Sequence, residues 1–324
     1  MNTKNTGEIS ILNRLKRGPV PMGLYGALGI IILIAIFINM TLGVNFFSPG
    51  NLLNVGRNYS MVAIAAMGQT FVIISGGLDL SVGSVISTSN VIAASYMTSN
   101  ALIFPVVLLC LLMGAAVGLF NGFLVTKRKV PPFIATLGVS IIINGLRLIW
   151  TNGMPRGSIP ENLKRFSTGS SLGIFPNLFL VFLVLAVLYS IILGRSGYGR
   201  RLYVIGNNPR VASLSGVKTD LEIIKAYVIC STAAALVGIL LGGYTGLSDN
   251  WVGSGYDLDS IAYAVLGGAA IGGGSGTIAG TVVGGFIMLM ITNLVLLASL
   301  PLESQLIIRG LVIITALYLS NRKK

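Results

Sequence analysis

Long apolar stretches recur along this chain of 324 residues and constrain its fold more than any other feature. A helix needs about 20 consecutive apolar residues to cross the hydrocarbon core of a bilayer. About ten segments approach that length, at residues 23–42, 59–75, 82–98, 102–125, 133–152, 173–193, 222–246, 258–273, 277–298 and 304–320. The pattern predicts an all-α integral membrane protein with one transmembrane domain over residues 23–320 and short tails at 1–22 and 321–324.

The composition excludes most kinds of catalysis. Hydrophobic residues make up 54% of the chain, charged residues only 10%, and mean hydropathy is +0.86. The chain has no His and nine Asp and Glu residues, so His-based acid–base chemistry and His-ligated metals are excluded. No G-x-x-x-x-G-K-[ST] phosphate loop occurs, and Cys110 and Cys230 lie in apolar runs. We therefore expect no enzyme, cofactor, metal or disulfide.

Positive charge is distributed unevenly between the predicted loops. With both termini in the cytoplasm, most of the 22 Lys and Arg residues fall on the cytoplasmic side, at Lys4, Arg14, Lys16, Arg17, Lys127, Arg128, Lys129, Arg195, Arg200, Arg201, Arg210, Lys218, Lys225, Arg322, Lys323 and Lys324. The outer side holds Arg57, Arg156, Lys164 and Arg165, and Trp150 and Trp251 fall at its interface. Such an excess marks cytoplasmic loops. We assign the net charge of +13 to contact with anionic lipid and expect no nucleic-acid partner.

Glycine spacing suggests an internal repeat. Shifting the sequence by 166 residues (242 − 76) places Gly76 on Gly242, Gly77 on Gly243, Gly114 on Gly280 and Gly118 on Gly284. In a protein of ten spans the matched helices would run in opposite directions, which is the 5+5 inverted-topology repeat common in transporters. Gly114, Gly118 and Gly122 also follow one another at four-residue steps, a spacing that favours close helix packing or a moving seam.

The turn from Gly76 to Ser84 contains a carboxylate, Asp79, between two short predicted spans. A carboxylate at this depth is costly unless it is satisfied. One interpretation is that Asp79 or Ser81 caps the third helix. The other is that helices interrupted at Gly76 and Gly77 leave polar backbone facing a pathway, so that the turn forms part of a gate.

Two polar stripes with helical spacing follow this turn. They comprise Ser84, Thr88 and Ser95 on the third predicted helix, and Thr136, Ser140, Asn144 and Arg147 on the fifth. Uncharged hydroxyl and amide groups on one face suit a neutral, hydroxyl-rich solute, but hydrogen bonding between helices explains them equally well. For Arg147 and Arg309 we expect snorkelling, or pairing with Glu303, Asp257 or Asp259, rather than solute contact.

The long predicted cytoplasmic loop over residues 194–221 contains a short helix. Asn208 before Pro209 is a helix start, and Gly216 is a stop. Val211 and Leu214 would face water unless a partner covers them, which favours a docking helix over a merely solvated loop. The expected docking residues are Asn208, Pro209, Arg210, Val211, Ala212, Ser213, Leu214, Ser215 and Gly216.

Several motifs resemble the permeases of ABC sugar importers of the ribose, xylose and arabinose type. They are Gly76 to Ser84 (GGLDLSVGS), Pro132 to Gly138 (PFIATLG), Thr151 to Pro155 (TNGMP), Gly199 to Val217, Gly255 to Ala262 (GYDLDSIA), and the glycine-rich stretch from Gly267 to Thr281. They cover nearly the whole chain in the order expected for that family.

The resemblance implies a permease that pairs with a second permease subunit, two ATPase subunits below and a sugar-binding protein above. Pro209 to Ser215 would be the coupling helix, the turn with Asp79 a gate, and Asp257 with Asp259 part of the outer mouth. The solute would be ribose or a related monosaccharide. A furanosyl signalling compound, a nucleoside or a branched amino acid remain alternatives, as does an ion-coupled secondary carrier.

Overall fold

The computed structural model describes residues 48–171 and 175–298, together with residues 24–26, 28–29, 32–33, 35–36, 301, 303–304, 307, 310–311 and 314. The predicted tails, Arg309 and most of the predicted first and last membrane helices lie outside the described residues.

Helices make up most of the described part. Its helices are α3 (Pro49–Ile74), α4 (Val82–Tyr96), η1 (Asn100–Leu102), α5 (Ile103–Thr126), α6 (Pro132–Thr151), α7 (Glu161–Thr168), α8 (Asn177–Arg195), α9 (Gly197–Asn207), α10 (Pro209–Leu214), α11 (Thr219–Thr245), α12 (Tyr256–Leu266) and α13 (Ile278–Leu297). Two short strands, β1 (Ser170–Ser171) and β2 (Phe175–Pro176), pair antiparallel. The predicted all-α class is confirmed.

Five helical segments among the described residues are long and apolar enough to cross a membrane. They are Asn100–Thr126, Pro132–Thr151, Asn177–Arg195, Thr219–Thr245 and Ile278–Leu297. Helices of this length and hydropathy place the chain in the bilayer as a multi-pass protein. α3, with 26 residues, is as long as these five segments but is not one of them. Its residues from Tyr59 to Ile74 are all buried within the protein.

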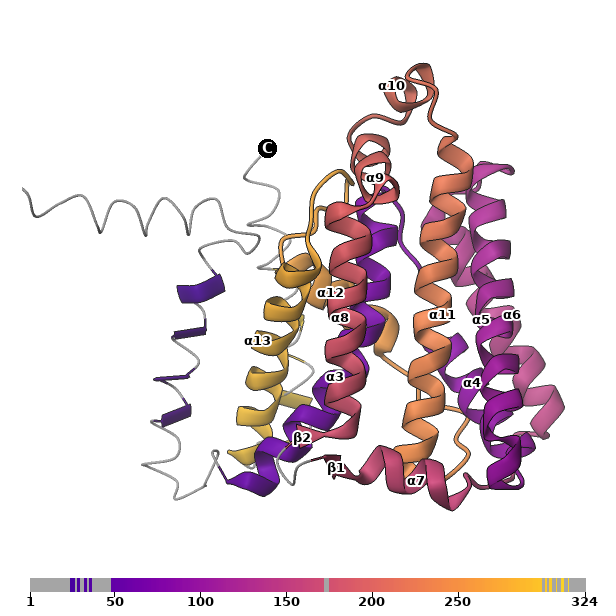
Figure 1. Ribbon diagram of the computed structural model, residues 1–324, viewed down its shortest axis with the longest axis vertical. Coiled ribbons are helices and arrows are strands. Elements are labelled where there is room, and N and C mark those ends of the chain that lie inside the picture. The colour runs from indigo at the N-terminus through magenta and orange to yellow at the C-terminus, as the bar shows by residue number, and fades with distance from the viewer. Residues whose placement is uncertain are drawn as a thin grey trace, which may run out of the picture.

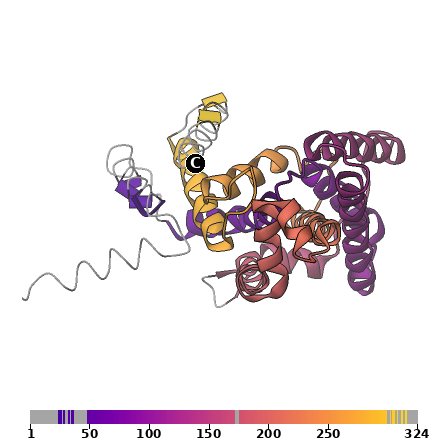
Figure 2. The same ribbon diagram turned by 90° about the horizontal axis from the view of Figure 1, so that it is seen from above.

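The long helices α3 and α11 run side by side in opposite directions. α3 begins near β2, where Gly56 contacts Pro176, and ends beside Gly206 of α9. α11 begins beside α9 and ends where Gly243 contacts Ser167 of α7. Figure 1 shows α10 and α7 at opposite ends of the molecule. Seen from above in Figure 2, α4 to α6 lie on one side and α13 on the other.

Glycines on α5 allow it to touch the backbone of α11. A Cβ on Gly118 would lie 2.5 Å from the carbonyl oxygen of Tyr227, and a Cβ on Gly122 would lie 2.8 Å from the Cα of Ile224. Small residues permit such contact where lipid supplies no hydrophobic drive for association. The packing interpretation of this stripe is therefore confirmed.

The helices α4 and α12 are only 15 and 11 residues long. At about 1.5 Å per residue, each is shorter than the roughly 30 Å hydrocarbon core. The predicted span 82–98 agrees with α4 to within two residues, whereas the predicted span 258–273 is too long. α12 stops at Leu266, because the glycine-rich loop that follows adopts positive φ at Gly268, Gly273 and Gly274. Gly76 lies in a turn whereas Gly242 lies inside α11, so the offset of 166 residues does not align equivalent positions.

Candidate functional site

The turn between α3 and α4 buries the carboxylate of Asp79 completely. Its Oδ1 accepts from the backbone N–H of Ser81 at 2.8 Å and from Ser81 Oγ at 2.6 Å, and its Oδ2 accepts from Ser231 Oγ of α11 at 3.2 Å. Asn121 of α5 donates to Ser81 Oγ at 2.8 Å and to Asp79 Oδ1 at 3.4 Å. Neutral donors from three elements therefore satisfy the carboxylate.

The turn lacks the side-chain cap that the first interpretation predicted for the third helix. Ser81 directly precedes α4, but its side chain makes no capping bond and donates to Asp79 instead. Asn121 and Ser231 were not predicted, because they lie 42 and 152 positions away from Asp79 and carry no local signal. The turn is fastened to α5 and α11, which gives it a fixed shape.

Gly77 and Thr136 complete the fastening of this turn. A Cβ on Gly77 would lie 2.5 Å from the hydroxyl oxygen of the buried Tyr227, so a larger residue would have to displace that side chain. Gly76 has φ of +86°, which also favours glycine. Thr136 Oγ1 accepts from the N–H of Leu80 at 3.0 Å and ties the turn to α6. Thr136 is buried and binds the turn, so it does not belong to a solute-facing surface as predicted.

The N-terminal ends of α4 and α12 meet inside the protein. A Cβ on Gly83, in the first turn of α4, would lie 2.6 Å from the carbonyl oxygen of Gly253, which precedes α12. The N–H of Gly253 donates to Ser87 Oγ at 2.9 Å. Two half-length helices that meet by their N-terminal ends are typical of transporter sites, where free N–H groups face the solute.

A polar cavity of about 180 Å³ lies at this meeting point. It is lined by Gly83, Ser84, Ser87, Ser140, Asn144, Arg147, Trp251, Gly253, Ser254, Gly255 and Asp257. The predicted pathway residues Ser84, Ser140 and Asn144 are thus brought together with the predicted mouth residue Asp257. Thr88 and Asp259 are not among the lining residues.

Arg147 does not snorkel, contrary to our expectation. Its side chain is 3% exposed, and it donates from Nη1 to the carbonyl oxygen of Ser84 at 3.2 Å and to Thr88 Oγ1 at 3.1 Å. Its Nη2 donates to the carbonyl oxygen of Asn250 at 2.7 Å. Arg147 therefore joins α6 to α4 and to the loop before α12, because oxygen atoms of those two segments accept from its buried Nη groups.

The predicted short helix of the long loop is present as α10. Asn208 Oδ1 accepts from the N–H groups of Arg210 and Val211 at 3.0 and 3.1 Å, and Gly216 has φ of +80°. Leu214 is 84% exposed and Val211 is 51% exposed, whereas Ala212 is buried. The predicted start, stop and apolar outer face of this helix are confirmed.

The neighbouring helix α9 connects α10 to the ends of the membrane helices. Tyr203 donates to the carbonyl oxygen of Gly276 at 2.7 Å, and Gly206 lies against Ile74 and Gly274. Burial raises the pKa of Tyr203 above its usual value, so its hydroxyl keeps the proton it donates. α9 thus contacts both the end of α3 and the loop between α12 and α13.

A family model described as "Branched-chain amino acid transport system / permease component" matches residues 51–317 of this chain. The chain belongs to this family of permeases. Its long apolar helices and its relatives make it a multi-pass membrane transport subunit rather than an enzyme.

Curated relatives of the permease include importers of sugars. The ribose import permease protein RbsC of Escherichia coli K12 is 35% identical over 91% of this chain and 93% of the relative. RbsC of Bacillus subtilis 168 is 35% identical over 91% and 92%. The autoinducer 2 import system permease protein LsrC of Photorhabdus laumondii is 34% identical over 86% and 83%. Among solved structures, none matches the permease.

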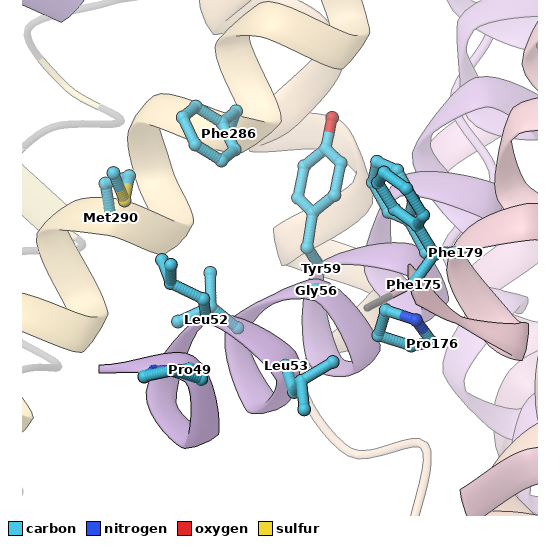
Figure 3. A pocket seen from close by; sticks show the side chains of 11 residues that line it. Pro49, Leu52, Leu53, Gly56, Tyr59, Phe175, Pro176, Phe179, Phe286 and Met290 are labelled. Carbon is cyan, nitrogen blue, oxygen red and sulfur yellow. The ribbon is translucent and has the colours of Figure 1, made fainter. Parts of the chain in front are cut away.

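The permease has a larger cavity of about 550 Å³ near the start of α3. Figure 3 shows side chains of Tyr59, Phe179, Phe286 and Met290 around it, from α3, α8 and α13. The hydroxyl of Tyr59 is already engaged with the carbonyl oxygen of Val282. An apolar lining offers few partners for hydroxyl groups, so this cavity suits hydrocarbon and not a polar solute.

Proposed function

We propose that this permease is the translocation subunit of an ATP-driven importer for ribose or a related monosaccharide. The observation that carries the proposal is the 35% identity to ribose import permeases over 91% of the chain. The polar cavity between α4 and α12 agrees with it, because Ser84, Ser140 and Asn144 offer hydroxyl and amide groups to a neutral solute.

An amino acid is the first alternative, because the family is described by amino acid transport. Its carboxylate would be best held by the paired donors of a free guanidinium. The Nη groups of Arg147 are already bound to Ser84, Thr88 and Asn250, so the cavity offers no free pair of Nη donors. The N-terminal ends of α4 and α12 attract a carboxylate, but Asp257 and Asp259 in the first turn of α12 repel one. A furanosyl signalling compound is the stronger second candidate, since relatives are named autoinducer 2 permeases. A nucleoside fits the cavity less well than a monosaccharide, because its base adds at least one ring to the sugar ring and the cavity is only about 180 Å³.

We further propose ten membrane helices in a 5+5 inverted repeat, with both termini in the cytoplasm. Two pairs of elements support the repeat: α3 with α4, and α11 with α12, each a long helix followed by an irregular segment and a helix too short to cross the bilayer. The two long helices run in opposite directions, as an inverted repeat requires. The basic residues around α9 and α10 support a cytoplasmic position for that end.

The proposed partners are two ATPase subunits, a second permease subunit and a soluble or lipid-anchored sugar-binding protein. α10 would dock the ATPase through Leu214 and Val211, whose exposure fits a helix seated in a groove. The motion of α10 would pass through α9 to Ile74, at the end of α3, and to Gly276, in the loop after α12. These two residues adjoin the segments that lead to the short helices α4 and α12. In this proposal Gly76, Gly77, Asp79 and Ser81 shape a gate, and Asp257 with Asp259 borders the outer opening.

The test is uptake by proteoliposomes that contain the permease with the ATPase and binding protein encoded beside it. We expect D-ribose or a related monosaccharide to accumulate only with enclosed ATP and Mg²⁺, and not with a non-hydrolysable ATP analogue. Leucine, an autoinducer-type furanosyl compound and a nucleoside serve as competitors. Uptake by the permease alone that follows an ion gradient would instead establish a secondary carrier.

A further inference from the structure

Two buried polar atoms beside the cavity between α4 and α12 have no hydrogen-bond partner among the described residues. They are Nε of Arg147, a donor, and Oδ1 of Asn250, an acceptor. Both residues are at least nine-tenths buried, at 3% and 2% exposure. Buried polar groups are nearly always paired, so these atoms indicate absent partners. Arg147 lines the cavity, so a hydroxyl oxygen of a molecule held there can accept from its Nε.

The charges around the cavity favour an uncharged ligand. Arg147 contributes one positive charge and Asp257 one negative charge, and both line the cavity. The N-terminal ends of α4 and α12 add partial positive charge, which Asp259, the second carboxylate in the first turn of α12, offsets. A site without a strong net charge gives no advantage to an anion or a cation.

Trp251 supplies a flat apolar surface at the same place. Its side chain lines the cavity and is 59% exposed. Its backbone N–H donates to Asp249 Oδ1 at 2.8 Å, and the N–H of Asp249 donates to Asn90 Oδ1 at 2.9 Å, which fixes the loop that carries the indole. An indole face covers the C–H face of a sugar ring while the polar groups reach its hydroxyls.

We propose that this cavity is a transit site that holds one monosaccharide ring, with Trp251 stacked on the ring and Asn144, Ser140 and Asp257 bonded to its hydroxyls. This inference rests on the proposed import of a monosaccharide. The volume of about 180 Å³ lies below the roughly 300–1,000 Å³ of sites for drug-sized ligands and suits a single ring. Nε of Arg147, which has no partner among the described residues, donates to a ring hydroxyl, while its Nη groups hold α4 and the Asn250 loop in place.

The experiment places a single cysteine in the cavity of the assembled importer. Asn144→Cys lies in the cavity, and Met154→Cys is the control, because Met154 is exposed in the loop after α6, outside the membrane helices and the cavity lining. The native Cys110 and Cys230 are buried and give little background. We expect a charged methanethiosulfonate reagent to modify both variants, and D-ribose to slow the reaction of Asn144→Cys several-fold without affecting Met154→Cys.

A second measurement addresses stacking. Trp251→Ala is expected to raise the KM for ribose uptake roughly two- to tenfold, as loss of an aromatic contact predicts. Trp251→Phe keeps an aromatic ring and is expected to have a KM close to that of the wild type. The thermal midpoint of each variant shows whether it folds.

The outcomes separate this inference from the proposed function. If the wild-type importer takes up ribose, yet ribose does not protect Asn144→Cys and the folded Trp251 variants transport like wild type, the transit site is wrong and the function stands. If the wild type takes up no monosaccharide in the presence of ATP, the proposed function fails, and the transit site fails with it.

Discussion

The backbone of Gly83 in α4 lies directly against the backbone of Gly253 before α12, where a Cβ on Gly83 would lie 2.6 Å from the Gly253 carbonyl oxygen. This contact joins two segments separated by the whole of α5 to α11. It brings together the N-terminal ends of two helices that are each too short to cross the bilayer. The polar cavity exists because these two ends meet there.

Gly253→Ala is expected to separate these two ends. The added methyl group would contact the Gly83 backbone, and overpacking of this kind costs about 1–3 kcal/mol. We expect a lower thermal midpoint in detergent and reduced ribose uptake. Gly145→Ala on α6 is the control, since its Cβ meets nothing within 4 Å and alanine favours a helix. Equal midpoints for the two variants would contradict the close contact.

Asp79→Asn is expected to preserve the turn, whereas Asp79→Ala is expected to disrupt it. An amide oxygen can still accept from Ser81 and Asn121, and its NH₂ group can donate to Ser231. Alanine leaves these buried donors unpaired at about 1–3 kcal/mol each. Expression level and thermal midpoint measure the difference. Loss of uptake in a well-folded Asp79→Asn variant would show that the charge itself has a role, as in an ion-coupled carrier.

Replacement of both Arg210 and Leu214 by Asp is expected to abolish ATPase association and uptake while the permease still inserts in the membrane. Both side chains are exposed on α10, so the substitutions leave the fold unchanged. Co-purification with the ATPase is the measurement. Met154→Asp, at an exposed position outside α9 and α10, is the control that should keep the ATPase bound. Retained association in the α10 variant would refute the docking assignment.

Tyr203→Phe is expected to weaken the connection between α9 and the loop after α12. It removes the 2.7 Å hydrogen bond to Gly276, worth about 1 kcal/mol. ATP hydrolysis should continue while fewer solute molecules enter per ATP, so the ratio of the two rates is the measurement. Because burial raises the pKa of Tyr203, its hydroxyl stays protonated below its usual pKa near 10, and this bond should give no pH dependence there. A ratio equal to wild type would exclude this route of coupling.

Local chemistry along the chain was enough to predict the class of protein and one complete element. Long apolar runs require a bilayer whatever their neighbours are. The α10 helix follows from Asn208, Pro209 and Gly216, all within nine positions, because caps and stops act through the adjacent backbone. The polar character of Ser84, Ser140 and Asn144 was also readable, since helical spacing puts such residues on one face.

The partners of these residues required the folded molecule. Asn121 and Ser231 reach Asp79 from helices that are distant in sequence, and the spacing along the chain does not determine which helices become neighbours. Arg147 turned inward because carbonyl groups of Ser84 and Asn250 lay within reach, and its own helix gave no sign of them. Spacing sets the face of a helix, whereas packing decides what that face meets, and the solute cavity is a product of packing.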